Sequence, residues 1–295
     1  METDGAPDFT ATPPGTARLG RIWTPWRMDY VTGGTREDGC VFCNRLGEAN
    51  DTAALIAHRG ETAFVILNLF PYNTGHVMLA PNAHAASPED IDTATTHEIA
   101  DLRRPVMRAL RRALSPVGFN LGVNVGAVAG AGIAAHLHEH VVPRWPGDAN
   151  FMPVIASTQV LPELLPITYA KIRAELQREL GGETDGVVVI LDATGDATLL
   201  AESALPRFSA GPDEPVWAAA LREAARLGVT DARLSGWAGG LVAGQGPAAL
   251  AVTGVLPAPN AVGSAAAADL LSPDDAELLA RGVALITSRA AASPD

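Results

Sequence analysis

Residues 136–143 read His-Leu-His-Glu-His-Val-Val-Pro, with three histidines at alternate positions. A β-strand has a side-chain period of two, so this spacing predicts a strand over 136–142 with all three imidazoles on one face. A single histidine is most simply explained as a structural residue, but three on one face indicate a functional site. A zinc site formed by all three is one alternative. The Cα atoms of His136 and His140 would lie roughly 13 Å apart, so at most two of the three should share a metal.

The segments around this strand predict an α+β fold. Alternating or β-branched runs predict further strands over 63–67, 76–80 and 119–125. Ser87-Pro-Glu-Asp90 is typical of a helix N-terminus, and apolar residues then recur every three or four positions up to Leu114. Pro105 lies inside this helical region and should break or kink it. We therefore expect a mostly antiparallel sheet with a helix on one face.

The expected domain boundary is Gly181-Gly182, which ends a helix predicted over about 161–180. We expect a disordered tail over 1–18, a first domain over 19–182 and an appended domain over 183–295. The appended domain should be a small α/β or α+β unit without a recognisable catalytic signature. Its expected elements are a hairpin within 187–201 and helices over 213–227 and from Ser272 onward.

Charge and composition exclude several classes of partner. The chain has 21 basic and 33 acidic residues, a net charge of −12 and a pI near 5.0, which argues against a broad basic surface for nucleic acid or anionic lipid. The N-terminus has no secretory signal, and prolines interrupt the uncharged stretch 234–268, so we expect no membrane span and a cytoplasmic protein. Cys40 and Cys43 form a single Cys-x-x-Cys, which in a reducing compartment predicts a metal site or a redox pair.

Several separated motifs occur in one order along the chain. They are Asn68-Leu-Phe-Pro-Tyr-Asn-Thr-Gly-His76, Pro81-Asn-Ala-His84, Asn124-Val-Gly126, and the histidine stretch continuing as His140-Val-Val-Pro-Arg-Trp145. Together they resemble the histidine triad (HIT) superfamily over about residues 20–180. The opening Trp23-Thr-Pro-Trp-Arg-Met-Asp-Tyr30 and the Cys-x-x-Cys are similar to the branch that includes diadenosine tetraphosphate phosphorylases. The resemblance implies a HIT-like antiparallel sheet with helices on one face, and a homodimer.

The resemblance also implies a set of catalytic and nucleotide-binding residues. His138, the middle histidine, would attack the α-phosphorus and form a nucleotidyl-histidine intermediate. His140 and Asn124 would bind phosphate oxygens, and His76 would orient the catalytic residues. Further nucleotide contacts are expected at Asn68, Gly126, Gly130, Gly132, Arg144 and Trp145. For Arg144 an ordinary surface arginine remains an alternative, and for Trp145 packing in the core does.

Zinc-bearing relatives use two cysteines, a histidine after the second strand and the first histidine of the triad. The resemblance places these ligands at Cys40, Cys43, His84 and His136. Four protein ligands make a closed zinc site, which is structural because a catalytic zinc keeps one position open. A redox dithiol is the alternative for the two cysteines, but the sequence shows no helix opening there in a βαβ unit.

Two positions depart from the family pattern. Many relatives have glutamine after the Ala-Gly of the loop, where Ala131-Gly132 stands in this chain. Glu139 occupies a position that is usually apolar, so its face should be partly wet or pair with an arginine. We expect an enzyme that cleaves a dinucleoside polyphosphate or other nucleotide conjugate by phosphorolysis or hydrolysis. The alternative is a regulatory module that binds nucleotide with weak or no turnover.

Overall fold

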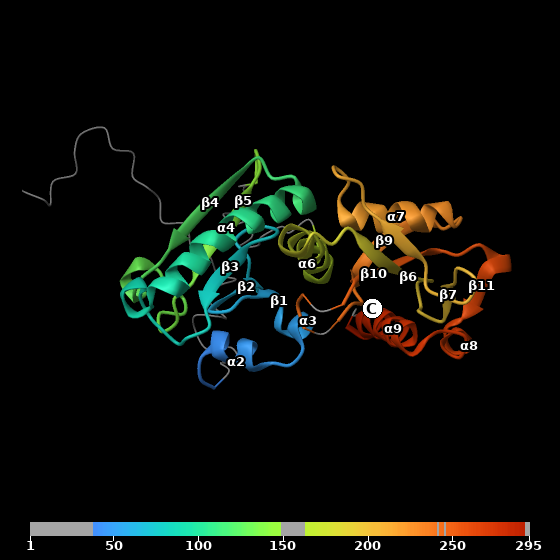
Figure 1. The fold of residues 1–295 in the computed structure, drawn as a ribbon, viewed down its shortest axis with the longest axis horizontal. Helices are drawn as coiled ribbons and strands as arrows, with labels where there is room; N and C mark the ends of the chain where they lie inside the picture. The colour runs from blue at the N-terminus through green and yellow to red at the C-terminus, as the bar shows by residue number, and fades with distance from the viewer. Residues whose placement is uncertain (1–37, 149–162, 241, 245, 293–295) are drawn as a thin grey trace, which may run out of the picture. The chain divides into compact units, whose positions relative to one another are not determined.

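The computed structural model describes residues 38–148, 163–240, 242–244 and 246–292 (Figure 1). These residues belong to one compact unit. The expected tail over 1–18 lies outside the described residues. None of the described helices is both long and apolar enough to cross a membrane.

The first sheet has five strands, and the last histidine of the triad, His140, lies in β5. Its strands are β1 (Ile56–Arg59), β2 (Ala63–Leu67), β3 (Val77–Pro81), β4 (Gly118–Val123) and β5 (Glu139–Arg144). They lie in the order β1-β2-β3-β5-β4, and every neighbouring pair is antiparallel. The α+β prediction with an antiparallel sheet is therefore confirmed.

The strand expected over 136–142 begins later, at Glu139, so that part of the prediction is wrong. In residues 136–138, hydrogen bonds with imidazole rings and with a loop carbonyl replace the backbone hydrogen bonds that pair one strand with the next. The His136 ring donates to the Pro81 carbonyl, the His138 ring donates to the His136 carbonyl, and the Leu137 amide donates to the Ala85 carbonyl. Only His140 of the three histidines lies within the strand.

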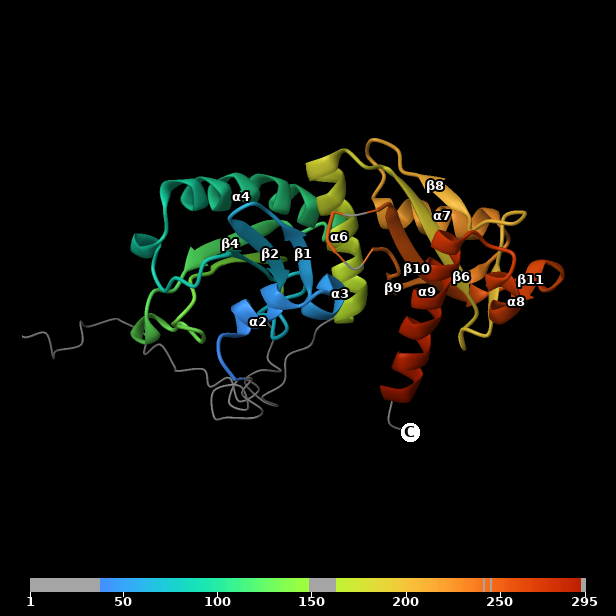
Figure 2. The same ribbon diagram turned by 60° about the horizontal axis from the view of Figure 1, so that its bottom comes forward.

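One face of the first sheet is covered by α4 (Thr93–Leu114), which follows the short helix η2 (Pro88–Asp90) (Figure 2). The Asp92 side chain caps α4 by accepting a hydrogen bond from the Thr95 amide at 2.8 Å. The buried stripe of α4 packs in one core with the sheet residues Val65, Leu79 and Val141.

Of the two effects expected of Pro105, the break is absent, because α4 is continuous from Thr93 to Leu114. The missing amide would have bonded to the carbonyl four residues earlier, at Asp101. Asp101 is exposed, so water can bind that carbonyl. Burial of Leu102 and Val106 on either side of the proline keeps the helix on the sheet.

Gly75 fixes the turn that leads into β3 and into His76. Its φ of +77° lies in the left-handed region that favours glycine. A Cβ at this position would stand 2.3 Å from Cδ1 of Leu114. The turn before His76 therefore packs directly on the last turn of α4, which holds this histidine in place.

The opposite face of the first sheet carries α2 (Val41–Gly47) and α3 (Asp51–Ala54). Phe42 of α2 is buried in a second core with Ile56, Phe64 and Met78. Met78 is paired with His140 across β3 and β5, so this is the face on which His140 lies. The histidines and α2 thus share one side of the sheet, with α4 on the other.

The appended domain contains the second sheet, in the order β11-β7-β6-β10-β9 with β8 also paired to β6. Its strands are β6 (Asp185–Leu191), β7 (Ala197–Leu199), β8 (Arg207–Ser209), β9 (Thr230–Trp237), β10 (Ala248–Val255) and β11 (Ala261–Gly263). Its helices are α7 (Val216–Arg226), η4 (Ala258–Asn260), α8 (Ser264–Ala268) and α9 (Pro273–Ala292). The expected hairpin and the two expected long helices are present.

Both faces of the second sheet are apolar because β6 is buried on both sides. Val188 and Ile190 pack in the core that contains α7, whereas Val187 and Val189 pack in the core that contains α9. The sheet therefore lies between two helices, as Figure 2 shows.

The helix α6 (Leu165–Gly181) joins the two halves of the described chain. Tyr169, Ile172 and Leu176 are at most 1% exposed and belong to one continuous core. That core includes α4 and the first sheet as well as α7 and the second sheet. The helix ends at Gly182, whose φ is +75°, as the sequence predicted.

Candidate functional site

Four potential metal ligands meet beside the first sheet. Cys40 is the N-cap of α2, Cys43 lies in its first turn, His84 follows β3 and His136 precedes β5. One ligand atom from each residue lies within 4.8 Å of all the others. Nδ1 of His136 is 3.3 Å from Sγ of Cys40 and 3.6 Å from Sγ of Cys43, and Nδ1 of His84 is 3.4 Å from Sγ of Cys43. These are the four residues that the resemblance implied.

The geometry of this cluster fits a four-coordinate metal ion. Tetrahedral zinc bonds to sulfur and nitrogen would separate those atoms by about 3.6 Å, close to the spacings observed. Nε2–H of His136 donates to the Pro81 carbonyl at 2.9 Å, which leaves the lone pair of Nδ1 directed to the cysteines. Burial lowers the pKa of His136 and favours this neutral form.

The two cysteines themselves favour a bound cation. Burial raises the pKa of Cys43, and the adjacent Cys40 raises it further. A metal ion would offset the repulsion between the two thiolates. Cys40 opens α2, but α2 leads into α3 and does not connect two parallel strands, which agrees with the sequence argument against a redox pair. The two imidazoles in contact with the sulfurs distinguish this cluster from a simple dithiol.

His138 directly precedes β5 and is only 5% exposed. Its Nδ1–H donates to the His136 carbonyl at 2.8 Å, so Nε2 of the neutral ring carries a lone pair. Burial lowers the pKa of His138, although this hydrogen bond acts in the opposite direction. Its ring centroid lies 5.0 Å from that of Phe42. The hydrogen bond from Nδ1 therefore fixes the orientation of the His138 ring and leaves the lone pair of Nε2 available for nucleophilic attack.

His76 and His140 form a directed hydrogen-bond chain. The Tyr72 amide donates to Nδ1 of His76 at 3.1 Å, so the proton of neutral His76 resides on Nε2. Nε2 of His76 is 2.9 Å from Nδ1 of His140 and donates to it. The proton of neutral His140 is then on Nε2, which makes that atom a hydrogen-bond donor. The backbone of the turn thus fixes the tautomer of His140 through His76.

Asn68 and Tyr72 complete this end of the site. The Asn68 amide nitrogen is 3.3 Å from Nδ1 of His76, and its side-chain oxygen accepts a hydrogen bond from the Phe70 amide at 2.9 Å. The Tyr72 ring centroid is 4.6 Å from that of His76 and 5.5 Å from that of His140. The structure therefore brings Asn68 beside His76, and its contact with a nucleotide stays a prediction.

Asn124 and the glycine-rich loop follow β4. The last paired residue of β4, Val123, stands opposite Glu139, and Asn124 follows it directly. The loop folds into η3 (Ala127–Ala129) between Gly126 and Gly130, whose φ values are +78° and +88°. These two glycines and Gly132 are exposed. The loop can therefore approach a ligand, and its nucleotide contacts stay a prediction.

Arg144 and Trp145 have defined partners in the described chain. Arg144 forms a two-pronged ion pair with Asp148 at 2.6 and 2.9 Å and also donates to Asn120. This arginine, together with the Trp145 amide and Asn73, lowers the pKa of Asp148 to about 2. Trp145 is half-buried and donates from its indole to the Ser115 carbonyl, so it is not a core residue. Nucleotide contacts of Arg144 and Trp145 remain predictions.

Glu139 pairs with an arginine, one of the two outcomes expected from the sequence. Its two carboxylate oxygens accept hydrogen bonds of 2.7 Å from Nε and a terminal nitrogen of Arg103 on α4. Glu139 is 6% exposed, so this pair satisfies a nearly buried charge behind the histidines.

Phe42 and Tyr72 lie against the histidine rings and Arg103 pairs with Glu139, and none of the three was predicted from the sequence. Phe42 lies inside the Cys-x-x-Cys and Tyr72 inside the motif that ends at His76, so both could have been considered. The apolar period of α4 gives no sign that Arg103 points to Glu139.

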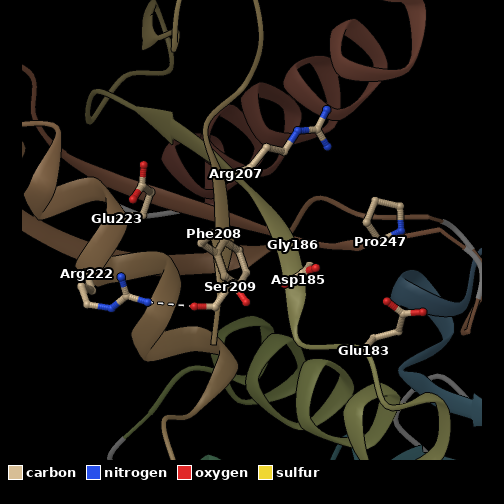
Figure 3. Close-up of a pocket in the computed structure, with 9 residues that line it drawn as sticks. All are labelled: Glu183, Asp185, Gly186, Arg207, Phe208, Ser209, Arg222, Glu223 and Pro247. Carbon is tan, nitrogen blue, oxygen red and sulfur yellow. Dashed lines mark hydrogen bonds between the residues drawn. The ribbon is translucent and has the colours of Figure 1, made fainter. Parts of the chain in front are cut away.

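A separate pocket of about 650 Å³ lies in the appended domain, between β6, β8 and α7 (Figure 3). Its two arginines already have partners: Arg207 pairs with Asp275, and Arg222 pairs with Glu214 and donates to the Ser209 carbonyl. None of the histidines or cysteines described above lines this pocket. The candidate active site is the cluster beside the first sheet in which His76, His138 and His140 contact one another.

Comparison with known proteins gives consistent matches for this part of the chain. The HIT domain profile matches residues 50–147. A protein named AP-4-A phosphorylase from Mycobacterium tuberculosis is 35% identical over 169 residues, covering 55% of this chain and 87% of that protein. An uncharacterized 16.1 kDa HIT-like protein from Mycoplasma pneumoniae is 32% identical over 114 residues, covering 39% of this chain and 77% of that protein.

Among solved structures, a zinc-bound histidine triad family protein from Mycobacterium smegmatis is 24% identical. The match covers 49% of this chain and 98% of that chain, with a TM-score of 0.39. The HIT domain match includes all three histidines of 136–140 and ends before the appended domain.

Proposed function

Because this chain belongs to the histidine triad (HIT) family, we propose that it cleaves a dinucleoside polyphosphate such as diadenosine tetraphosphate, or a related nucleotide conjugate. The activity of the M. tuberculosis relative, as its name gives it, supports this substrate class. The observation that carries the proposal is the tautomer of His138, whose Nδ1–H is bound to the His136 carbonyl. That hydrogen bond leaves Nε2 with a free lone pair on a ring of fixed orientation. The other histidines of the triad, His136 and His140, lie beside it.

The proposed reaction has two displacements at the α-phosphorus. Nε2 of His138 forms a bond to phosphorus, and the bond from phosphorus to the bridging oxygen breaks, so that the nucleoside polyphosphate leaves with its electron pair. An oxygen of inorganic phosphate or of water then displaces the nucleotide from His138. Phosphate gives a nucleoside diphosphate, and water gives a nucleoside monophosphate. Nδ1 of His138 keeps its proton and its bond to the His136 carbonyl throughout.

Other residues of the site would stabilise charge on the phosphate. His140 is oriented through His76 with a proton on Nε2, and that atom would donate to a phosphate oxygen. Asn124, which follows the β4 residue paired with Glu139, would supply a second donor. Asn68 would hold the ribose hydroxyls beside His76. The Tyr72 amide would not contact the substrate itself; it would orient His76, which in turn orients His140.

Zinc is the metal we propose for Cys40, Cys43, His84 and His136. Two thiolates and two imidazoles are a common donor set for structural zinc, and four protein ligands leave no open position. The bound ion would supply stability to the fold. His136, as one of its ligands, would then be held in place together with the carbonyl that orients His138. The two cysteine ligands also support a reducing compartment, the cytoplasm, as the place of action.

The test of this function is product analysis with diadenosine tetraphosphate, with and without inorganic phosphate. We expect ADP and ATP when phosphate is present, since the relative is a phosphorylase. AMP and ATP in both reactions would assign hydrolysis instead. Tight binding of the substrate without any product would contradict an enzyme and favour a nucleotide-binding regulatory module.

We further propose a homodimer formed through β4. This strand is at the edge of the described sheet, and its apolar residues Leu121 and Val123 are 42% and 39% exposed. Leu121→Glu is expected to convert a two-chain particle into a single chain in sedimentation or light scattering. Leu270→Glu, at a leucine 56% exposed in the appended domain, is the matched control and should leave the mass unchanged. A wild-type protein of one-chain mass would contradict the proposal.

A further inference from the structure

Asp51, the first residue of α3, is completely buried and binds two different parts of the chain. Its Oδ1 accepts a hydrogen bond of 2.8 Å from Nε of Arg59. Its Oδ2 accepts a hydrogen bond of 2.6 Å from the backbone amide of Ala243. Ala243 is buried and belongs to the connection between β9 and β10 of the appended domain. One carboxylate thus links the HIT part of the chain to the appended domain.

Arg59 extends this link to the helix that carries the cysteines. Its two terminal nitrogens donate to the carbonyls of Leu46 and Glu48, at 2.7 and 2.9 Å. These carbonyls are at the C-terminal end of α2, where main-chain oxygens lack partners within the helix. Cys40 and Cys43 are at the other end of the same helix. The guanidinium therefore holds α2 by its last turn, and Asp51 holds the guanidinium.

A second contact fixes α3 against the same part of the appended domain. Arg173 of α6 is 1% exposed and donates to the Thr52 hydroxyl at 3.1 Å and to the Gly240 carbonyl at 2.8 Å. Its guanidinium carbon lies 4.5 Å from the centre of the Trp237 ring. Because this contact does not use Asp51, α3 should stay adjacent to Gly240 when the Asp51 carboxylate is altered.

We propose that Asp51 is a positioning residue through which the appended domain holds the metal-bearing helix α2 in place. The proposal rests on the zinc site proposed above, because two of its four ligands are on α2. It gives residues 183–295 a role in retaining the metal that does not require them to contact the nucleotide. The groups that orient metal ligands often determine how firmly the metal is held.

The chemistry of the carboxylate makes the proposal testable with one substitution. A carboxylate accepts hydrogen bonds at both oxygens, whereas an asparagine has one accepting oxygen and an amide that only donates. Asp51→Asn therefore cannot serve both Arg59 and the Ala243 amide. The side chain keeps nearly the same volume, so packing around α3 changes little.

The appended domain provides a matched control in Asp275. This aspartate is 3% exposed and also accepts from one backbone amide, that of Leu205 at 3.1 Å, and from one arginine, Arg207 at 2.8 Å. Asp275→Asn makes the same chemical change in an equivalent setting that has no link to α2. It reports what loss of such a contact does to the stability of the whole protein.

The experiment loads the full-length protein with zinc and measures the rate at which a coloured chelator removes it. We expect release from Asp51→Asn to be about ten-fold faster than from wild type, the lower end of the effect of such orienting groups on metal sites. Asp275→Asn should release zinc at the wild-type rate. Arg59→Lys is a second variant, which keeps the charge beside Asp51 but loses the two-carbonyl contact, and it should also accelerate release.

Three results would overturn the inference. They are a wild-type release rate in both Asp51→Asn and Arg59→Lys, equal acceleration in Asp275→Asn, and a wild-type chain that takes up no zinc. Turnover of diadenosine tetraphosphate by the wild-type enzyme is measured separately. A failure of the release experiment with turnover intact contradicts only the role of Asp51, whereas absent turnover with altered release contradicts only the proposed reaction.

Discussion

His138→Ala should abolish nucleotide turnover, lowering kcat by at least about 1,000-fold, since a covalent nucleophile has no substitute in the site. The variant should remain folded and keep its zinc, because His138 is not among the four clustered ligands. Initial rates with diadenosine tetraphosphate, metal analysis and circular dichroism measure the three quantities. Loss of turnover with metal content unchanged would separate the nucleophile from the metal site.

The intermediate gives a second, independent measurement of the same mechanism. Wild-type enzyme quenched during turnover of substrate labelled at the α-phosphorus should carry an acid-labile label, and His138→Ala should carry none. His97→Ala, which removes an exposed histidine of α4, is the control for loss of an imidazole and should retain the label and the activity. Full activity in His138→Ala would show that another group attacks phosphorus.

His84→Ala is expected to remove the metal and to lower the free energy of unfolding by about 3 kcal/mol or more, since metal binding contributes directly to folding. For a chain of this size that corresponds to a fall in Tm of about 10 °C. His84 is the exposed member of the four ligands, so its removal creates no cavity in the core. The loss of stability therefore reports the metal itself.

Metal analysis and thermal unfolding before and after treatment with a chelator measure this effect. Wild type should contain about one zinc per chain and lose stability on chelation, whereas His84→Ala should be insensitive to the chelator. His97→Ala should behave as wild type in both measurements. A wild-type protein that contains no metal and unfolds at the same temperature with and without chelator would exclude a structural zinc.

The sequence predicted the elements of the fold well where local signals and burial agree. The antiparallel strands, the helix α4 and the end of α6 at Gly182 all follow from alternation, apolar period and glycine. Two expected features are absent because longer-range contacts prevailed. Packing of α4 on the sheet prevents a break at Pro105, and hydrogen bonds from imidazoles replace sheet pairing before Glu139.

The resemblance to the family implied Cys40, Cys43, His84 and His136 as metal ligands, and the structure places these four residues in one cluster. The hydrogen bonds of the candidate site were not predictable in the same way. The tautomers of His138 and His140 could not be predicted, since they depend on the His136 carbonyl and the Tyr72 amide. The link from Asp51 to Ala243 joins residues 192 positions apart and has no signature in either segment.

The burial of α6 has a consequence for how this chain can be rearranged by recombination. A domain joined to a protein by a solvated linker can be exchanged or deleted as a module. Here the joining helix contributes Tyr169, Ile172 and Leu176 to a core shared with both sheets, so a new partner attached at Gly182 would have to supply a complementary apolar surface. The two halves must therefore evolve together, with substitutions on α6 constrained from both sides.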